Sequence, residues 1–261
     1  ITDEWKTSYS VEPYIVNEPH GYSSNKNWEL IEKKSNKLEF KINYPENDLV
    51  DHLIRTIEVQ DDKPHNIFCR LQIHVKEDCE LPIGLHPMFR IPKKMSKIKI
   101  NPGNFKFGLN YPGLVLKDKT LGAIGREFSS LDKVEGFDGN TIDLSQPPFD
   151  GNFEDLFQLC GIDGNMSLEN FEENYKFNFS WNPNHFTSVL MWVSNKGRTE
   201  YPWNSNHVTI GFEPITSAFG LSTHVSLNKN NPISKRNVAT SLKLYKNKPL
   251  FTDYSFSISA L

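Results

Sequence analysis

The sequence predicts an all-β protein built as a large antiparallel β-sandwich, and two features of the 261-residue chain carry that prediction. Apolar and polar residues alternate in several short runs, which is the pattern of strands with one buried face. Clusters of Pro, Gly, Asn and Asp separate these runs, as turns do. A helical period is sustained nowhere over three turns, so we expect little helix.

The alternating runs are spread along the chain. In each run, the residues expected to share one face are Leu38, Phe40, Ile42 and Tyr44; Ile67, Cys69, Leu71, Ile73 and Val75; Tyr175, Phe177, Phe179 and Trp181; Tyr254, Phe256 and Ile258. Turn signals lie at 61–64, 101–103, 147–148, 182–184 and 229–232. A turn or two of helix is expected near Ser129 to Val134. Without a linker or an internal repeat, we expect one domain over 1–261.

Composition and charge limit the classes of binding partner and the cellular location that we expect. The formal net charge is -3 and the pI is about 6.3, which does not favour nucleic acid or an anionic membrane. The longest apolar run, Phe186 to Val193, is too short to span a bilayer. The first residues carry no secretory signal. Cys69, Cys79 and Cys160 are expected to be free thiols in a reducing compartment, with a single disulfide as the alternative, so we expect a cytoplasmic protein.

Three segments place titratable side chains among glycines and prolines, where strands end and functional groups are often found. They surround His20, His86 and Glu213. Taken alone, His86 fits equally a histidine packed beneath a loop, and Glu213 a surface carboxylate at a strand end. If a histidine and a glutamate meet in one pocket, they form a general acid and base.

The order of the motifs is more specific than any one of them. The chain has His20-Gly21 followed by Trp28, then GLHPMFRIP at Gly84 to Pro92, WVSNKGR at Trp192 to Arg198, YPW at Tyr201 to Trp203 and GFEPITSAF at Gly211 to Phe219. From about residue 19 to the C-terminus, this series resembles the aldose 1-epimerase (galactose mutarotase-like) superfamily. The resemblance implies that family's supersandwich fold and an isomerase that interconverts the α and β anomers of a sugar.

The resemblance also implies roles for the titratable residues. His86 matches the family's general acid, which would protonate the ring oxygen of a pyranose. Glu213 matches the general base, which would take the proton from the anomeric hydroxyl. His20 matches a second histidine that hydrogen-bonds the substrate. A carboxylate and an imidazolium can share this proton transfer near neutral pH without a metal or another cofactor, so we expect none.

Three further residues are candidates for binding the sugar. The family usually has an acidic residue that holds sugar hydroxyls, and the resemblance places it at Asp155 or, less preferred, at its neighbour Glu154. Arg90 lies within the histidine motif and contacts either the substrate or a carboxylate. Lys93-Lys94 follows that motif and is a solvated pair or a contact for a sugar phosphate.

Two other functions compete with the isomerase. One is a non-catalytic carbohydrate-binding or regulatory domain of the same fold, which would not need both His86 and Glu213. The other is a sandwich domain of a polysaccharide-degrading enzyme, which would be attached to a catalytic domain. In each case the expected partner is a small-molecule sugar.

Overall fold

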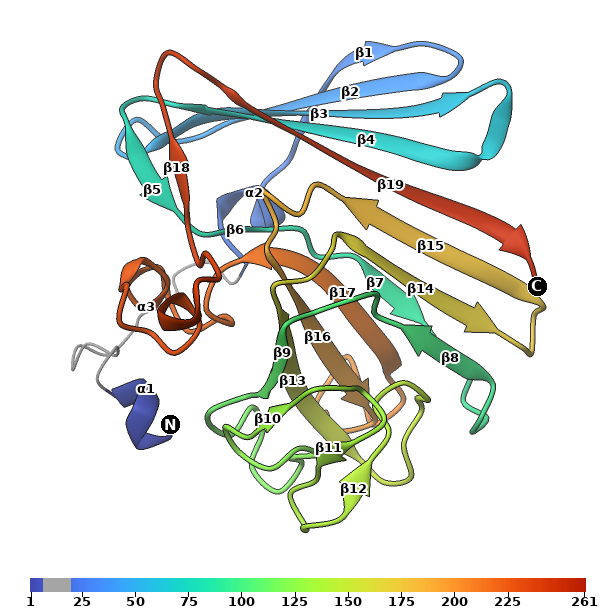
Figure 1. Cartoon of the computed structure of the whole chain (residues 1–261). Coiled ribbons are helices and arrows are strands. Elements are labelled where there is room, and N and C mark those ends of the chain that lie inside the picture. Colours follow the sequence, from blue (N-terminus) through green and yellow to red (C-terminus); the bar gives the residue numbers. More distant parts are fainter. Residues whose placement is uncertain (7–19) are drawn as a thin grey trace.

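The structure is a computed structural model that describes residues 1–6 and 20–261. Two large β-sheets pack against each other, and short helices lie at their margins (Figure 1). The strands within each sheet are antiparallel, as the pairings of β3 with β4 (Val50–Gln60 and Lys63–Val75) and of β16 with β17 (Ser188–Asn195 and Val208–Thr216) illustrate. The predicted all-β antiparallel sandwich is therefore confirmed.

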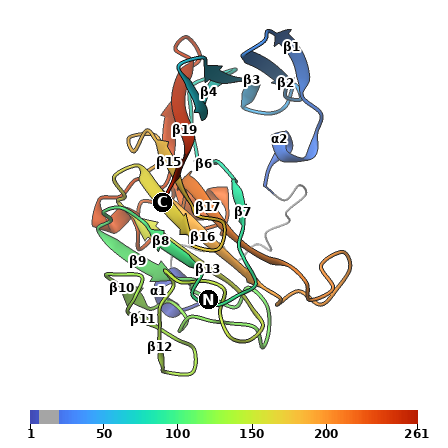
Figure 2. The ribbon, with the colours of Figure 1, turned by 90° about the vertical axis from the view of Figure 1, so that its right-hand side faces the viewer.

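One sheet has eight strands and contains all four of the alternating runs. In order across the sheet, its strands are β1 (Glu29–Lys33), β2 (Lys37–Asn43), β3, β4, β19 (Leu250–Ala260), β15 (Tyr175–Trp181), β14 (Asn165–Asn170) and β8 (Ile98–Asn101). Alternation is visible in these sequences because one face packs on the core and the other meets solvent. Strands β1 to β3 extend to the side of the region where the sheets overlap (Figure 2).

The other sheet has seven strands and holds the candidate site. Its order is β10 (Glu127–Phe128), β9 (Phe107–Asn110), β13 (Phe153–Cys160), β16, β17 and β6 (Ile83–Gly84), and β7 (Met88–Arg90) also pairs with β17. All nine residues of β17 are buried. Both faces of this strand are therefore covered, which removes the polar alternation from its sequence.

The core lies on both faces of the seven-stranded sheet. Between the sheets, side chains of β17 such as Ile210 and Phe212 join Leu71 and Ile73 of β4 in one apolar cluster. A second apolar cluster covers part of the opposite face, and Trp5 and Leu190 are both members of it. The rest of that opposite face carries the polar residues described below.

The remaining elements are short. They are the two-stranded pairs β11 (Val134–Glu135) with β12 (Thr141–Ile142) and β5 (Cys79–Leu81) with β18 (Leu242–Leu244), the helices α1 (Asp3–Lys6), α2 (Tyr22–Asn25) and α3 (Thr223–Leu227), and a 3-10 turn at Ser234–Arg236. The helix expected near Ser129 to Val134 is wrong: the segment turns and enters β11, where Val134 is completely buried. Tertiary packing thus overrides the local preference.

Two further findings concern the cysteines and membrane spans. Cys69, Cys79 and Cys160 are all free thiols, which agrees with the first of the two alternatives. Within residues 1–6 and 20–261, no helix has the length and apolar character needed to cross a membrane.

Candidate active site

Glu213 lies in the middle of β17 on the face turned away from the eight-stranded sheet. Its neighbour Phe212 points into the core between the sheets, so alternation along the strand sends the carboxyl group to the other side. Gly211 lies two residues earlier on the same face, and a Cβ there would be 2.7 Å from Oε1 of Glu213. The absence of a side chain at Gly211 therefore gives the carboxyl group its position.

His86 is placed directly opposite Glu213 by the break between β6 and β7. Backbone hydrogen bonds bracket it: Leu85 N donates to Pro214 O at 2.9 Å, and Phe212 N donates to Pro87 O at 3.2 Å. Because Pro87 has no N–H, the strand cannot continue its ladder through this point. The chain leaves the sheet briefly, and the His86 ring comes to lie beside the carboxyl group.

The His86 ring and the Glu213 carboxyl group form a close, partly shielded pair. Nε2 of His86 is 3.6 Å from Oε1 of Glu213, and the two side chains are 32% and 8% exposed. Burial raises the pKa of Glu213 to about 8. Burial, followed by the Coulombic effect of His20, lowers the pKa of His86 below its usual 6.5. At neutral pH the pair thus retains one proton, on the carboxyl group.

His20 joins this pair from the N-terminal side. Its ring lies edge-on to that of His86, with the centroids 4.4 Å apart. His20 and Gly21 have positive φ values of 63° and 78°, and a positive φ is uncommon for a histidine. Pro19, which begins this motif in the sequence, lies outside the described residues.

Glu154 occupies the same face as Glu213, two strands away on β13. Its carboxylate is completely buried. Oε1 of Glu154 accepts a hydrogen bond from Nε1 of Trp192 at 2.7 Å and another from Nε of Arg198 at 2.8 Å. The Trp192 indole in turn lies 6.4 Å from the His86 ring, between centroids. Oε2 of Glu154 has no hydrogen-bond partner among the residues that the structure describes.

Asp155, the preferred sugar-binding carboxylate in the sequence, faces away from the site. As the neighbour of Glu154 on β13, it lies on the opposite face of the sheet. Its carboxylate accepts hydrogen bonds from the backbone N–H groups of Leu121 and Gly122 at 2.9 Å and of Leu156 at 2.8 Å. Burial raises the pKa of Asp155 to about 6 even though these donors favour the charged form. The expectation that Asp155 lies in the pocket is therefore corrected: Asp155 anchors a loop.

Arg90 is exposed and forms an ion pair at some distance along β7. Its Nη2 lies 2.8 Å from Oε1 of Glu173, in the turn between β14 and β15. Two roles were expected for Arg90, contact with the substrate or pairing with a carboxylate. In the structure Arg90 pairs with a carboxylate. Lys94 likewise pairs with Glu172 at 3.1 Å.

The sequence motifs contained two site residues to which no role was assigned. Trp192 and Arg198 are the first and last residues of WVSNKGR, and both are bound by Glu154. His207 has its Nδ1 2.9 Å from Oγ of Ser194. Its ring is 5.7 Å from Trp192, so it supports the same indole.

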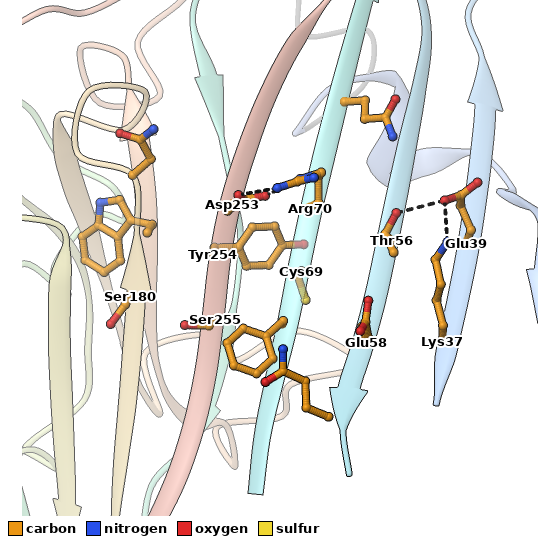
Figure 3. A pocket seen from close by; sticks show the side chains of 15 residues that line it. Lys37, Glu39, Thr56, Glu58, Cys69, Arg70, Ser180, Asp253, Tyr254 and Ser255 are labelled. Carbon is orange, nitrogen blue, oxygen red and sulfur yellow. Dashed lines mark hydrogen bonds and ion pairs between the residues drawn. The ribbon is translucent and has the colours of Figure 1, made fainter. Parts of the chain in front are cut away.

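A depression of about 690 Å³ lies elsewhere, on the solvent-facing side of the eight-stranded sheet (Figure 3). Two ion pairs lie in it: Arg70 Nε is 2.6 Å from Oδ1 of Asp253, and Lys37 Nζ is 3.5 Å from Oε2 of Glu39. In the described part of the chain, none of the six residues expected at the site lines this depression. Over residues 1–6 and 20–261, no three His, Cys, Asp or Glu side chains are grouped to hold a metal ion.

Comparison with known proteins identifies the fold. No protein-family model matches the sequence, and no curated protein matches it. An inferred aldose 1-epimerase from Escherichia coli K12 has a TM-score of 0.66 at 12% identity, covering 97% of this chain and 76% of that one. A galactose mutarotase-like protein from Clostridium acetobutylicum has a TM-score of 0.60 at 16% identity, covering 95% and 72%. The chain has the galactose mutarotase-like β-sandwich fold that its motifs predicted.

Proposed function

We propose that this protein is an aldose 1-epimerase-like isomerase that interconverts the α and β anomers of a sugar, with His86 and Glu213 as its acid and base. Mutarotation opens a hemiacetal by moving one proton off O1 and another onto O5, two oxygens bonded to the same carbon. Acid and base must therefore stand side by side. The observation that carries the proposal is the 3.6 Å separation of Nε2 of His86 and Oε1 of Glu213.

The pair needs one proton to work, and the pKa values support that state near neutral pH. With the pKa of Glu213 at about 8 and that of His86 below 6.5, the resting proton lies on Glu213. The carboxylate–imidazolium form, in which Glu213 accepts from O1 while His86 donates to O5, is reached by moving this proton to His86. Ring closure on the other face of C1 returns both protons, so the pair ends as it began.

Other residues of the site would bind and orient the sugar. His20 lies against the His86 ring and is placed to hydrogen-bond a hydroxyl group. Glu154 has one carboxylate oxygen without a partner among the described residues, which fits an acceptor for a sugar hydroxyl. The Trp192 indole offers an apolar face beside His86 for the C–H side of a pyranose. The three free thiols support a reducing compartment, and we propose that the protein acts in the cytoplasm.

Replacement of the catalytic carboxyl group tests the proposal. Glu213→Gln keeps the shape of the side chain but can neither accept nor donate the proton, so anomer exchange should fall by roughly a hundred- to several-thousandfold. Exchange NMR on a freshly dissolved single anomer measures this rate for several aldoses. Sugar binding, followed by saturation-transfer NMR, should persist in the variant.

A matched control removes a different carboxylate. Glu173→Gln makes the same side-chain replacement at the exposed Arg90 ion pair, away from the site, and should leave the exchange rate at the parent value. A Glu213→Gln variant that exchanges anomers as fast as the parent would exclude Glu213 as the base. If the parent binds sugar without exchanging its anomers, the protein is instead a carbohydrate-binding domain.

A further inference from the structure

The four methionines of the chain differ in their exposure to solvent, and one of the two exposed ones lies at the acid–base pair. Met166 and Met191 are 1% and 0% exposed, so their sulfur atoms are sealed in the core. Met88 is 36% exposed and Met95 is 53% exposed. Met95 lies on the connection between β7 and β8, whereas Met88 begins β7, two residues after His86.

Strand pairing places the side chain of Met88 on the face that carries Glu213. Met88 lies opposite Gly211 in the antiparallel pairing of β7 with β17, and residues paired in this way project to the same face of a sheet. Gly211 and Glu213 are two residues apart on β17 and therefore share that face. Because Gly211 has no side chain, the Met88 thioether takes the space beside its Cα: a Cβ on Gly211 would be 3.2 Å from Sδ of Met88.

The sulfur atom of Met88 therefore lies close to the Glu213 carboxyl group. The position of a Cβ on Gly211 is 2.7 Å from Oε1 of Glu213. Sδ of Met88 and this oxygen can thus be no more than 5.9 Å apart, the sum of 3.2 Å and 2.7 Å. Nε2 of His86 is 3.6 Å from the same oxygen. The thioether and the imidazole are both neighbours of the oxygen that shares the proton.

The other groups that face Glu213 offer its carboxyl group little polar contact. On β16, the apolar residue Leu190 lies opposite Glu213. The carboxylate of Glu154, on β13, already accepts two hydrogen bonds. His20 contacts the acid–base pair through the His86 ring. These surroundings leave the carboxyl group protonated at rest, because burial raises its pKa to about 8.

Oxidation changes the thioether of Met88 from an apolar group into a hydrogen-bond acceptor. A hydroperoxide transfers one oxygen atom to the sulfur: the O–O bond breaks, an S–O bond forms, the sulfur loses two electrons, and the peroxide leaves as water or an alcohol. The sulfoxide oxygen would compete with Nε2 of His86 for the proton of Glu213. The carboxyl group would then hold its proton more tightly and transfer it less readily.

We propose that Met88 is a site of reversible oxidation beside the acid–base pair, and that conversion of its thioether to the sulfoxide by a hydroperoxide lowers the rate of anomer exchange. Methionine sulfoxide reductases restore the thioether with two electrons from thiols and release the oxygen as water. The inference rests on the proposed function for the reaction that is inhibited. The position of the sulfur beside Glu213 is independent of that function.

Limited oxidation of the full chain with hydrogen peroxide tests the proposal. Mass spectrometry of peptides follows oxygen addition at Met88 and Met95, and exchange NMR measures anomer exchange in the same samples. The rate should fall about tenfold or more as Met88 is oxidised, the size of effect that a competing hydrogen bond at a buried carboxyl group has. A mixture of the two methionine sulfoxide reductase types, one for each sulfoxide epimer, should restore the rate. Dithiothreitol alone should not restore it, which separates Met88 from the free thiols.

Two substitutions assign the effect to one sulfur atom. Met88→Leu has a similar volume and cannot form a sulfoxide, so peroxide should leave its exchange rate at that of its own untreated sample. Met95→Leu removes the other exposed methionine and should keep both the parent rate before treatment and the full loss after it. A carbon-13 NMR titration of Glu213 in the parent is independent of catalysis and of any substitution. The pKa of Glu213, about 8 before treatment, should rise when Met88 is oxidised.

Three results would overturn the proposal. They are an unchanged exchange rate in a sample whose Met88 is fully oxidised, a loss of rate in Met88→Leu equal to that of the parent, and a pKa of Glu213 that stays at about 8 after oxidation. If this pKa rises on oxidation of Met88 but the untreated protein does not exchange anomers, the influence of Met88 on Glu213 stands and the isomerase proposal fails. The two proposals are thereby separated.

Discussion

Substitution of Gly211 by alanine should inactivate the site without unfolding the protein. The added Cβ would lie 2.7 Å from Oε1 of Glu213, whereas ordinary contacts begin at 3.4 Å, so the carboxyl oxygen must move by 3.4 − 2.7 = 0.7 Å or more. The same Cβ would be 3.2 Å from Cβ of Trp192, so the added methyl group cannot relieve the contact by moving toward Trp192. A misplacement of about 1 Å costs on the order of a hundredfold in rate, or about 2.7 kcal/mol of barrier.

The assay is anomer exchange by NMR, with the melting temperature measured alongside. Gly220→Ala is the matched control, because a Cβ there meets nothing within 4 Å and the residue lies in the same motif region. We expect Gly211→Ala to lose about a hundredfold in kcat with a melting temperature close to that of the parent, and Gly220→Ala to retain full activity. Full activity in Gly211→Ala would refute the argument that this glycine positions the base.

Two further outcomes follow from the pKa values and from Asp155. The rate of exchange should be bell-shaped in pH. It should fall above about 8 as Glu213 loses the shared proton, and fall again on the acid side as His86 becomes protonated too, at a pH lower than the 6.5 of an ordinary histidine. A rate independent of pH across this range would contradict the pairing. Asp155→Ala should lower the free energy of unfolding by roughly 3 kcal/mol, because it leaves buried N–H groups without an acceptor. Urea denaturation measures that loss, and KM for sugar should not change, since a large rise in KM would return Asp155 to the binding site.

Alternation in the sequence identified the eight-stranded sheet better than the other. One face of this sheet contacts solvent, so apolar and polar residues alternate with a period of two in β2, β4, β15 and β19. In β17 the period is hidden, because Gly211 and Glu213 are covered on one face while Phe212 is covered on the other. The motif containing Glu213 was therefore found by its chemistry and its resemblance to a family.

The candidate site could be predicted only in part for a related reason. His20, His86 and Glu213 were expected to converge, and their rings and carboxyl group do lie together. The choice between Glu154 and Asp155 depended on which face of β13 each occupies. A shift of one residue reverses that assignment, and nothing in the local sequence fixes it. Pairing of β13 with β16 decides the matter in three dimensions.

The strand that carries the base is held by backbone pairing on both sides, unlike the segment that carries His20. Strand β17 is hydrogen-bonded on one side to β16 and on the other to β6 and β7. Its amides can exchange with solvent only when the whole sheet opens. His20 is solvent-exposed and precedes a four-residue helix, outside the strands of both sheets. The proposed base is therefore fixed by the sheet itself, and a local opening around His20 would leave it in place.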